Sequence, residues 1–205
     1  MALAPAEVQA RVRAKVASLP EVERAHWDSV LARSGFPTDT LRFYAVSLDS
    51  LGRPIPVMST DQAMSYLGPE SPVDEGPRYL QPFLLPYPVG LFVDGLGPVI
   101  ANDAYATPDV WQMFERDLYH SPRVVWGREV NILLTALARP GDGNRAARDS
   151  ILSAVERSGL RHAELWSYRI DGAGLHPVRY GTSSDVQLWS LTDLAVQFLL
   201  NTPGP

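Results

Sequence analysis

The chain has 205 residues, of which 45% are hydrophobic and 20% charged, and its formal net charge is −5. This balance is typical of a globular protein with one well-buried core, and 23 acidic against 18 basic residues argue against a nucleic-acid surface, which normally shows a clustered basic excess. No apolar run reaches the roughly 18 residues of a membrane span, so we expect neither nucleic acid nor a membrane as a partner.

The residue types that are missing narrow the chemistry further. The absence of cysteine excludes disulfides and thiolate metal sites. The four histidines are scattered without the i, i+4 spacing of a zinc helix, so we expect no metal site. A glycine-rich phosphate loop and the G-x-S-x-G motif are also missing, and we expect no cofactor. The N-terminus lacks a hydrophobic signal core, which favours a cytoplasmic location.

The first elements along the chain are two helices and a hairpin. Valines at helical spacing predict a helix over 5–18, and a second amphipathic pattern predicts a helix over 20–34 that stops at Gly35. Two apolar runs within 41–57 flank a turn at Asp49–Gly52, so this segment predicts a β-hairpin.

The middle of the chain is rich in proline. A short helix capped by Ser59 or Thr60 comes first. The prolines of 54–122 forbid long helices, so we expect extended, tightly turned segments with one short helix near 76–85. A helix over 108–118 follows, with proline at its first position.

The second half is more regular and predicts three helices. Apolar residues recur at helical spacing in 127–141 and again in 144–159. A strand around Glu164 and a turn at 171–174 precede a last helix, capped by Ser183 or Ser184. The residues expected to face inward on that helix are Leu188, Leu191, Ala195 and Phe198.

These patterns give about seven helices and one or two small hairpins joined by long, aromatic loops. Strands and helices do not alternate regularly, which rules out the parallel α/β folds. We therefore predict an all-α fold, organised as a single domain over residues 1–205, in which the loops carry function on a helical scaffold.

Aromatic residues beside carboxylates are the strongest chemical signal. Rings stack on the C–H faces of sugars, while charged groups bond sugar hydroxyls. On an alternating strand, Glu164 lies on the same face as the rings of Trp166 and Tyr168. The same pattern also fits core aromatics with acids that cap helices or form surface ion pairs. The candidate substrate-binding residues are Tyr119, His120, Trp126, Arg128, Glu129, Trp166 and Tyr168.

Three segments together resemble a known family. They read RFYAVSLDSLGRPIPVMSTDQAMSYL, then YHSPRVVWGREVNILLTALAR, and finally AELWSY followed by VRYGTSSDVQLWSLTDLAVQFLL. In this order they resemble the catalytic domain of glycogen-debranching, amylo-α-1,6-glucosidase-like enzymes of the six-hairpin glycosidase superfamily, over roughly residues 41–200. The resemblance implies an (α/α)6 toroid of helical hairpins with small β-hairpin insertions, of which this chain supplies about half, the C-terminal portion of the barrel.

The resemblance also assigns roles to individual residues. The family's catalytic base is the glutamate of a closing PEL strand, and AEL puts Glu164 at that position, with Ala163 in place of the proline. Trp126 and the Tyr119–His120 pair fall on the family's substrate-lining loop. Residues 127–131 depart from the family's proline–histidine–aspartate continuation.

Hydrolysis with inversion needs a second carboxyl group, the general acid, about 6.5–9.5 Å from the base. The family's acid lies well upstream, so the resemblance implies that it is missing here and that an N-terminal half-barrel chain or a homo-oligomer completes the site. Glu129 and Asp103 are in-chain carboxylates that could take its place, without support from a motif. The base must stay ionised, and Arg161, Arg169 or Arg179 would help.

Three hypotheses follow. The first is a glycoside hydrolase portion that acts on an α-glucoside or oligosaccharide with Glu164 as base. The second is a non-catalytic carbohydrate-binding or assembly protein that dimerises to cover an exposed inner face. The third is a helical structural domain without a sugar site.

Overall fold

The computed structural model describes residues 1–45, 47–67, 79–116, 123–138, 142–181, 183–185 and 192–201. The helices are α1 (Pro5–Ala17), α2 (Glu21–Ser34), the 3-10 helix η1 (Thr60–Tyr66), α3 (Gln81–Leu84), α4 (Pro108–Arg116), α5 (Gly127–Ala136), α6 (Asp142–Ser158) and α7 (Thr192–Asn201). The strands are β1 (Ala2–Leu3), β2 (Leu41–Arg42), β3 (Met58–Ser59), β4 (Phe92–Val93), β5 (Gly97–Pro98), β6 (Ala101–Asn102), β7 (Val125–Trp126), β8 (Leu165–Asp171) and β9 (Gly174–Arg179).

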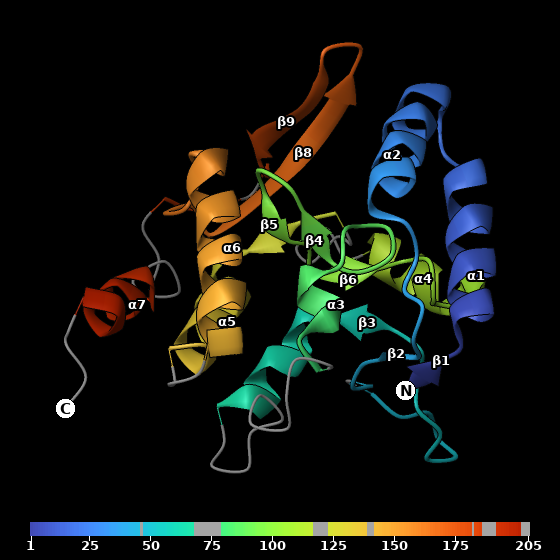
Figure 1. The fold of residues 1–205 in the computed structure, drawn as a ribbon, viewed down its shortest axis with the longest axis horizontal. Coiled ribbons are helices and arrows are strands. Elements are labelled where there is room, and N and C mark those ends of the chain that lie inside the picture. The colour runs from blue at the N-terminus through green and yellow to red at the C-terminus, as the bar shows by residue number, and fades with distance from the viewer. Residues whose placement is uncertain are drawn as a thin grey trace.

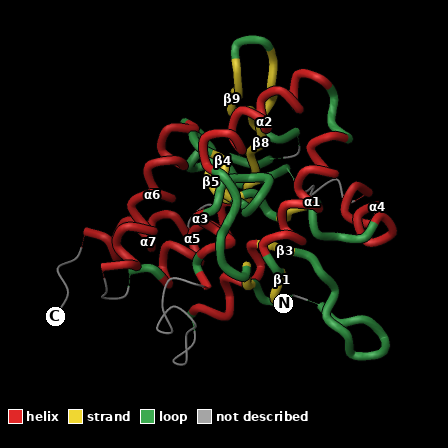
Figure 2. The backbone as a smooth tube through the Cα atoms, turned by 45° about the vertical axis from the view of Figure 1, so that its right-hand side comes forward, coloured by secondary structure: helices red, strands yellow, loops and turns green. Residues whose placement is uncertain are grey.

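Short sheets and loops separate two groups of helices (Figure 1). Helices α1 and α2 lie on one flank, and α5 and α6 lie on the other, with β4, β5 and β6 between them. The strand pairs are β1–β2, β3–β6, β4–β5 and the three-stranded β7–β8–β9, all antiparallel. The β8–β9 hairpin projects beyond the rest of the chain beside α2 (Figure 2).

The predicted all-α, (α/α)6 toroid-type fold is wrong. The structure is mixed: 48% of the described residues are helical and 18% are in strands, with several antiparallel sheets. The main physical reason lies in the proline-rich middle of the chain, where missing N–H donors and fixed φ angles prevent helices. There β4, β5 and β6 form short strand pairs at the centre, which a toroid would fill with helical hairpins.

The helices predicted over 5–18, 20–34, 108–118, 127–141 and 144–159 are present as α1, α2, α4, α5 and α6. The predicted faces are buried in α1, α5 and α6, because their apolar residues recur every three to four positions. In η1 the Ser59 hydroxyl accepts a hydrogen bond from the backbone N–H of Asp61 at 3.2 Å, as the expected cap requires. None of the helices in the described segments is both long and apolar enough to cross a bilayer.

The predicted hairpin at 41–57 is only partly present. Its turn at Asp49–Gly52 is confirmed, because the Gly52 N–H donates to the Asp49 carbonyl at 2.9 Å and an isolated bridge joins Leu48 to Pro54. The flanking strands, however, pair elsewhere: β2 with β1 and β3 with β6. Val57 packs with Ile100 and Ala101 in a small apolar cluster, and this burial favours the long-range pairing.

The last helix also differs from the prediction. Helix α7 is described from Thr192 to Asn201, and residues 186–191, which would follow the expected cap, lie outside the described residues. The Ser183 hydroxyl accepts from the Leu165 N–H at 3.0 Å. Ala195 and Phe198, expected inside, are exposed, and Leu188 and Leu191 lie outside the described residues. The buried face carries Asp193 instead, because Arg161 and Gln197 hold its carboxylate.

One large cluster of buried apolar residues joins the two flanks. It runs from Leu3 and the α1 valines through the central strands to Val196 of α7. Trp27 of α2 and Trp166 of β8 are among its largest members and are almost fully buried. This core fixes β8 and the start of α5 against each other, which positions the candidate site.

Candidate functional site

The start of α5 lies against the start of β8. The β7–β8 pairing sets Trp126 opposite Leu165, and the Gly127 N–H donates to the Glu164 carbonyl at 2.9 Å. A side chain at Gly127 would put its Cβ 3.1 Å from the Ala163 carbonyl oxygen, so glycine allows this close approach. We call the group Trp126, Arg128, Glu129 and Glu164 the α5–β8 junction.

Glu164 immediately precedes β8 and is 1% exposed. Its Oε2 accepts from the Ser184 N–H at 3.2 Å, while its own N–H donates to the Ser184 carbonyl at 3.1 Å. Its Oε1 is buried and has no hydrogen-bond partner within the described part of the chain. The side chain is thus held at one oxygen and leaves the other without a bond.

Glu129, in the first turn of α5, is also 1% exposed. One oxygen pairs with Arg128, whereas Oε2 lacks a hydrogen-bond partner among the described residues. Burial, with a further contribution from the negative charge of Asp61, raises the pKa of Glu129 to about 7, although Arg128 opposes the shift. The Arg128 guanidinium also lies over the Trp126 ring, 5.1 Å from its centroid.

The other aromatics predicted to bind substrate lie elsewhere. Trp166 is fully buried, and its Nε1–H donates to the Leu96 carbonyl at 3.0 Å. Tyr168 packs edge-on against Trp27, with ring centroids 5.7 Å apart. Both rings therefore contribute to the core instead of presenting a face to a sugar. Tyr119 and His120 lie outside the described residues.

The arginines expected to keep Glu164 ionised form ion pairs with other carboxylates. The Arg161 pair is short and largely buried, at 2.6 Å, whereas the other two are exposed and the Arg169 pair is 3.7 Å long. The arginines are Arg161, Arg169 and Arg179, and their partners are Asp193, Asp171 and Asp185, respectively.

Asp103, the other carboxylate considered as an acid, is fully engaged. Its Oδ1 accepts from the buried Tyr87 hydroxyl at 2.8 Å, and its Oδ2 pairs with Lys15. Burial and the neighbouring Asp103 raise the pKa of Tyr87 well above its usual value. This Lys15–Asp103–Tyr87 network ties α1 to the centre of the core and is a structural arrangement.

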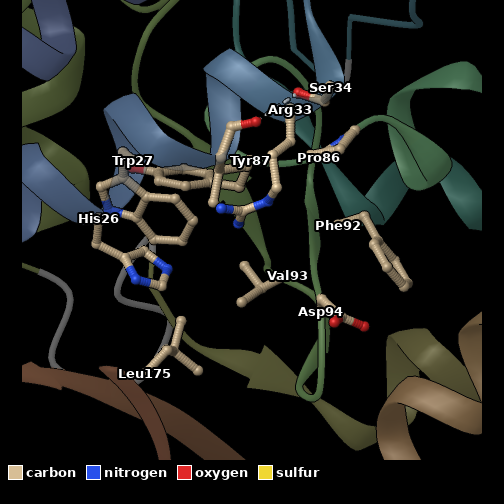
Figure 3. A pocket seen from close by; sticks show the side chains of 11 residues that line it. His26, Trp27, Arg33, Ser34, Pro86, Tyr87, Phe92, Val93, Asp94 and Leu175 are labelled. Atoms are coloured by element: carbon tan, nitrogen blue, oxygen red, sulfur yellow. Dashed lines mark hydrogen bonds between the residues drawn. The ribbon is translucent and has the colours of Figure 1, made fainter. Parts of the chain in front are cut away.

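Sequence reasoning missed a pocket beside α2. His26, Val30 and Arg33 line it at i, i+4 and i+7, together with residues of the 86–94 segment (Figure 3). The spacing itself was a usable signal, because three such positions share one helix face. The facing wall comes from a distant segment, and only the folded chain shows it.

The described residues hold no group of three or more histidines, aspartates or glutamates placed to bind a metal ion. Comparison of the chain with protein-family models, with curated proteins and with solved structures found no match.

Proposed function

We propose that this chain is a carbohydrate-active protein whose α5–β8 junction supplies the acid–base pair of a glycoside hydrolase, with Glu129 as acid and Glu164 as base. The observation that carries the proposal is that both buried carboxyl groups of the α5–β8 junction have an oxygen without a hydrogen-bond partner in the described chain. Folded proteins bond nearly all buried polar atoms. At Glu129 the unpaired oxygen coincides with a raised pKa, and perturbed pKa values cluster at functional sites.

The two carboxyl groups differ in a way that suits the two roles. A pKa of about 7 leaves Glu129 protonated in about half of the molecules at neutral pH, so it has a proton to donate. Glu164 is fixed by the Ser184 N–H at one oxygen, and its other oxygen is available to take a proton from water. Arg128 and Trp126 add a guanidinium donor and an aromatic ring for a sugar.

In the proposed reaction, Glu129 gives its proton to the glycosidic oxygen as the bond from that oxygen to the anomeric carbon breaks. Glu164 takes a proton from a water molecule whose oxygen forms the new bond to the anomeric carbon. One water is consumed, and proton exchange with solvent restores both carboxyl groups. An α-glucoside is the substrate class that the sequence resemblance implies.

The burial of the two groups favours a second candidate, a non-catalytic carbohydrate-binding protein. A reacting sugar must contact both carboxyls, and each is 1% exposed in the folded chain. Trp126 and Arg128 are less deeply buried. They can contact a sugar in a protein that binds it without hydrolysis.

The test is glucose release from maltose and isomaltose by the full-length chain, measured from about pH 5 to about pH 9. We expect Glu164→Gln to lower kcat by roughly 100- to 10,000-fold. In the wild type, activity should fall as the pH rises through about 7, because Glu129 loses its proton. Glu129→Gln should lower kcat over the whole range and abolish this decline.

Glu156→Gln is the matched control, because Glu156 lies on an exposed part of α6 and pairs with Arg161. It should leave kcat unchanged. If wild-type activity is present and Glu164→Gln retains it, the base assignment is wrong. Sugar-induced change in tryptophan fluorescence without glucose release supports the second candidate, and the absence of both signals excludes both.

A further inference from the structure

The pocket beside α2 has the dimensions of a small-molecule site. Its volume is about 450 Å³, and α2, the 86–94 segment and Leu175 of β9 enclose it (Figure 3). Pockets for small ligands commonly measure about 300–1,000 Å³. It lies on the α2 flank, whereas the α5–β8 junction begins on the opposite flank (Figure 1).

The walls of the pocket are mostly apolar and are fixed by aromatic packing. Trp27 meets Tyr87 edge-on, with ring centroids 4.8 Å apart, and His26 meets Trp27 at 4.7 Å. The Tyr87 hydroxyl is anchored in turn by Asp103. Because these rings are already ordered, a ligand loses little free energy in arranging them. The remaining apolar lining residues are Val30, Pro86, Phe92, Val93 and Leu175.

The pocket carries a cation that no carboxylate neutralises within the described chain. Figure 3 shows the Arg33 guanidinium turned toward the space near Val93. Its Nη1–H donates to the Ser29 hydroxyl at 2.6 Å, and Arg33 takes part in none of the ion pairs of the described residues. Asp94 across the pocket is paired with Arg157 of α6.

The positive charge of Arg33 also acts on His26, which lines the same pocket. Burial, followed by the charge of Arg33, lowers the pKa of His26, so its ring is neutral at neutral pH. A neutral imidazole adds one donor and one acceptor at the wall. Since Asp94 is paired with Arg157, Arg33 is the charged lining residue that none of the described ion pairs neutralises.

We propose that this pocket binds a small monocarboxylic acid built on one apolar ring, with the ring against Val30, Phe92 and Leu175 and the carboxylate on Arg33. A guanidinium presents two parallel N–H donors that match the two oxygens of a carboxylate. One arginine neutralises a carboxylate but leaves a phosphate dianion partly uncompensated.

The test is calorimetric titration of the full-length chain with phenylacetate and with cyclohexanecarboxylate. Phenylacetamide serves as the neutral counterpart, and phenyl phosphate tests the preference for carboxylate. We expect at least one acid to bind, and phenylacetamide and phenyl phosphate to bind more weakly. Arg33→Gln should weaken binding of the acid by roughly 10- to 100-fold, the range for a charged hydrogen bond.

Arg24→Gln is the matched control, since Arg24 is an exposed arginine of the same helix that does not line the pocket. It removes the same charge and should leave the affinity unchanged. Both substituted side chains are exposed, and an unchanged thermal unfolding midpoint would verify that each variant folds. The proposal is overturned if neither acid binds, if the two variants lose affinity equally, or if phenyl phosphate binds most tightly.

Discussion

Two regions of this protein bury carboxyl groups in opposite ways. On the α1 and α2 flank, Asp103 has a partner for each oxygen, Tyr87 at 2.8 Å and the ammonium of Lys15. At the α5–β8 junction, Glu129 and Glu164 each keep one oxygen without a partner in the described chain. All three residues are at most 7% exposed, so burial alone does not distinguish them.

The difference fits a structural role for Asp103 and, under the proposed function, a catalytic role for Glu129 and Glu164. When a buried carboxylate pairs with a cation and a hydroxyl, these contacts offset much of the free energy lost on leaving water. Removing the carboxylate then leaves its buried partners without a counter-charge or hydrogen bond. A buried carboxyl with an unbonded oxygen costs stability, and one way to lower that cost is to hold a proton. The raised pKa of Glu129 is an instance of this effect. Replacing each carboxylate by its amide therefore tests the contrast directly.

The largest effect is expected for Asp103→Asn. The amide can still accept from Tyr87, but it leaves Lys15, whose side chain is only 18% exposed, without its counter-charge. We expect the free energy of unfolding to fall by about 3 kcal/mol, as when one partner of a buried ion pair is removed. Urea unfolding measures the change, and a loss below about 1 kcal/mol would show that the network is not structural.

Glu129→Gln, in contrast, should raise the free energy of unfolding, but only at a pH above about 4.5. Because the folded-state pKa of about 7 exceeds the ordinary 4.5, the wild type loses stability as the pH rises from about 4.5 through about 7. The full loss is on the order of 3 kcal/mol. The amide does not titrate, so the variant should be as stable as wild type at low pH and more stable at pH 8.

Urea unfolding at several pH values checks this expectation. Glu7→Gln is a suitable control, because Glu7 is an exposed partner of Arg11 on α1. Its stability difference from wild type should stay small and change little with pH. A Glu129→Gln variant that is less stable than wild type at pH 8 would show that the Arg128 pair outweighs burial.

The smallest effect on stability is expected for Glu164→Gln. The amide oxygen can keep the bond from the Ser184 N–H at 3.2 Å, and none of the described ion pairs involves Glu164. We expect the free energy of unfolding, measured from the thermal midpoint, to change by less than about 1 kcal/mol. Under the proposed function, the same substitution should lower kcat by roughly 100- to 10,000-fold. A loss as large as that of Asp103→Asn would place Glu164 in the structural group instead.

Local patterns in the sequence located most helices because they depend on neighbouring residues. The valines of α1 and the leucines of α5 recur at helical spacing, and the structure buries them. The strand pairs could not be predicted in the same way, because paired residues such as Met58 of β3 and Asn102 of β6 lie far apart in the sequence. Such pairing depends on burial shared between distant segments, and no local pattern contains it.

For the candidate site, too, the sequence indicated some residues correctly, whereas the role of others depends on packing. The sequence pointed to Glu164 through the AEL stretch, and to Trp126, Arg128 and Glu129 through their grouping. It also grouped Trp166 with Glu164 on one strand face, but the structure uses this ring in the core, bonded to Leu96. An aromatic side chain has the same pattern in both settings, so only packing decides between them.

Spacing along the backbone was enough to place most helices and to group acidic residues with aromatic ones, because both patterns are local. Long-range packing was needed to show that the fold is mixed, that Asp103 is neutralised and that the pKa of Glu129 is about 7. The physical reason is that desolvation and charge pairing depend on distant segments brought together: Lys15 reaches Asp103 from α1, and Asp61 acts on Glu129 from η1.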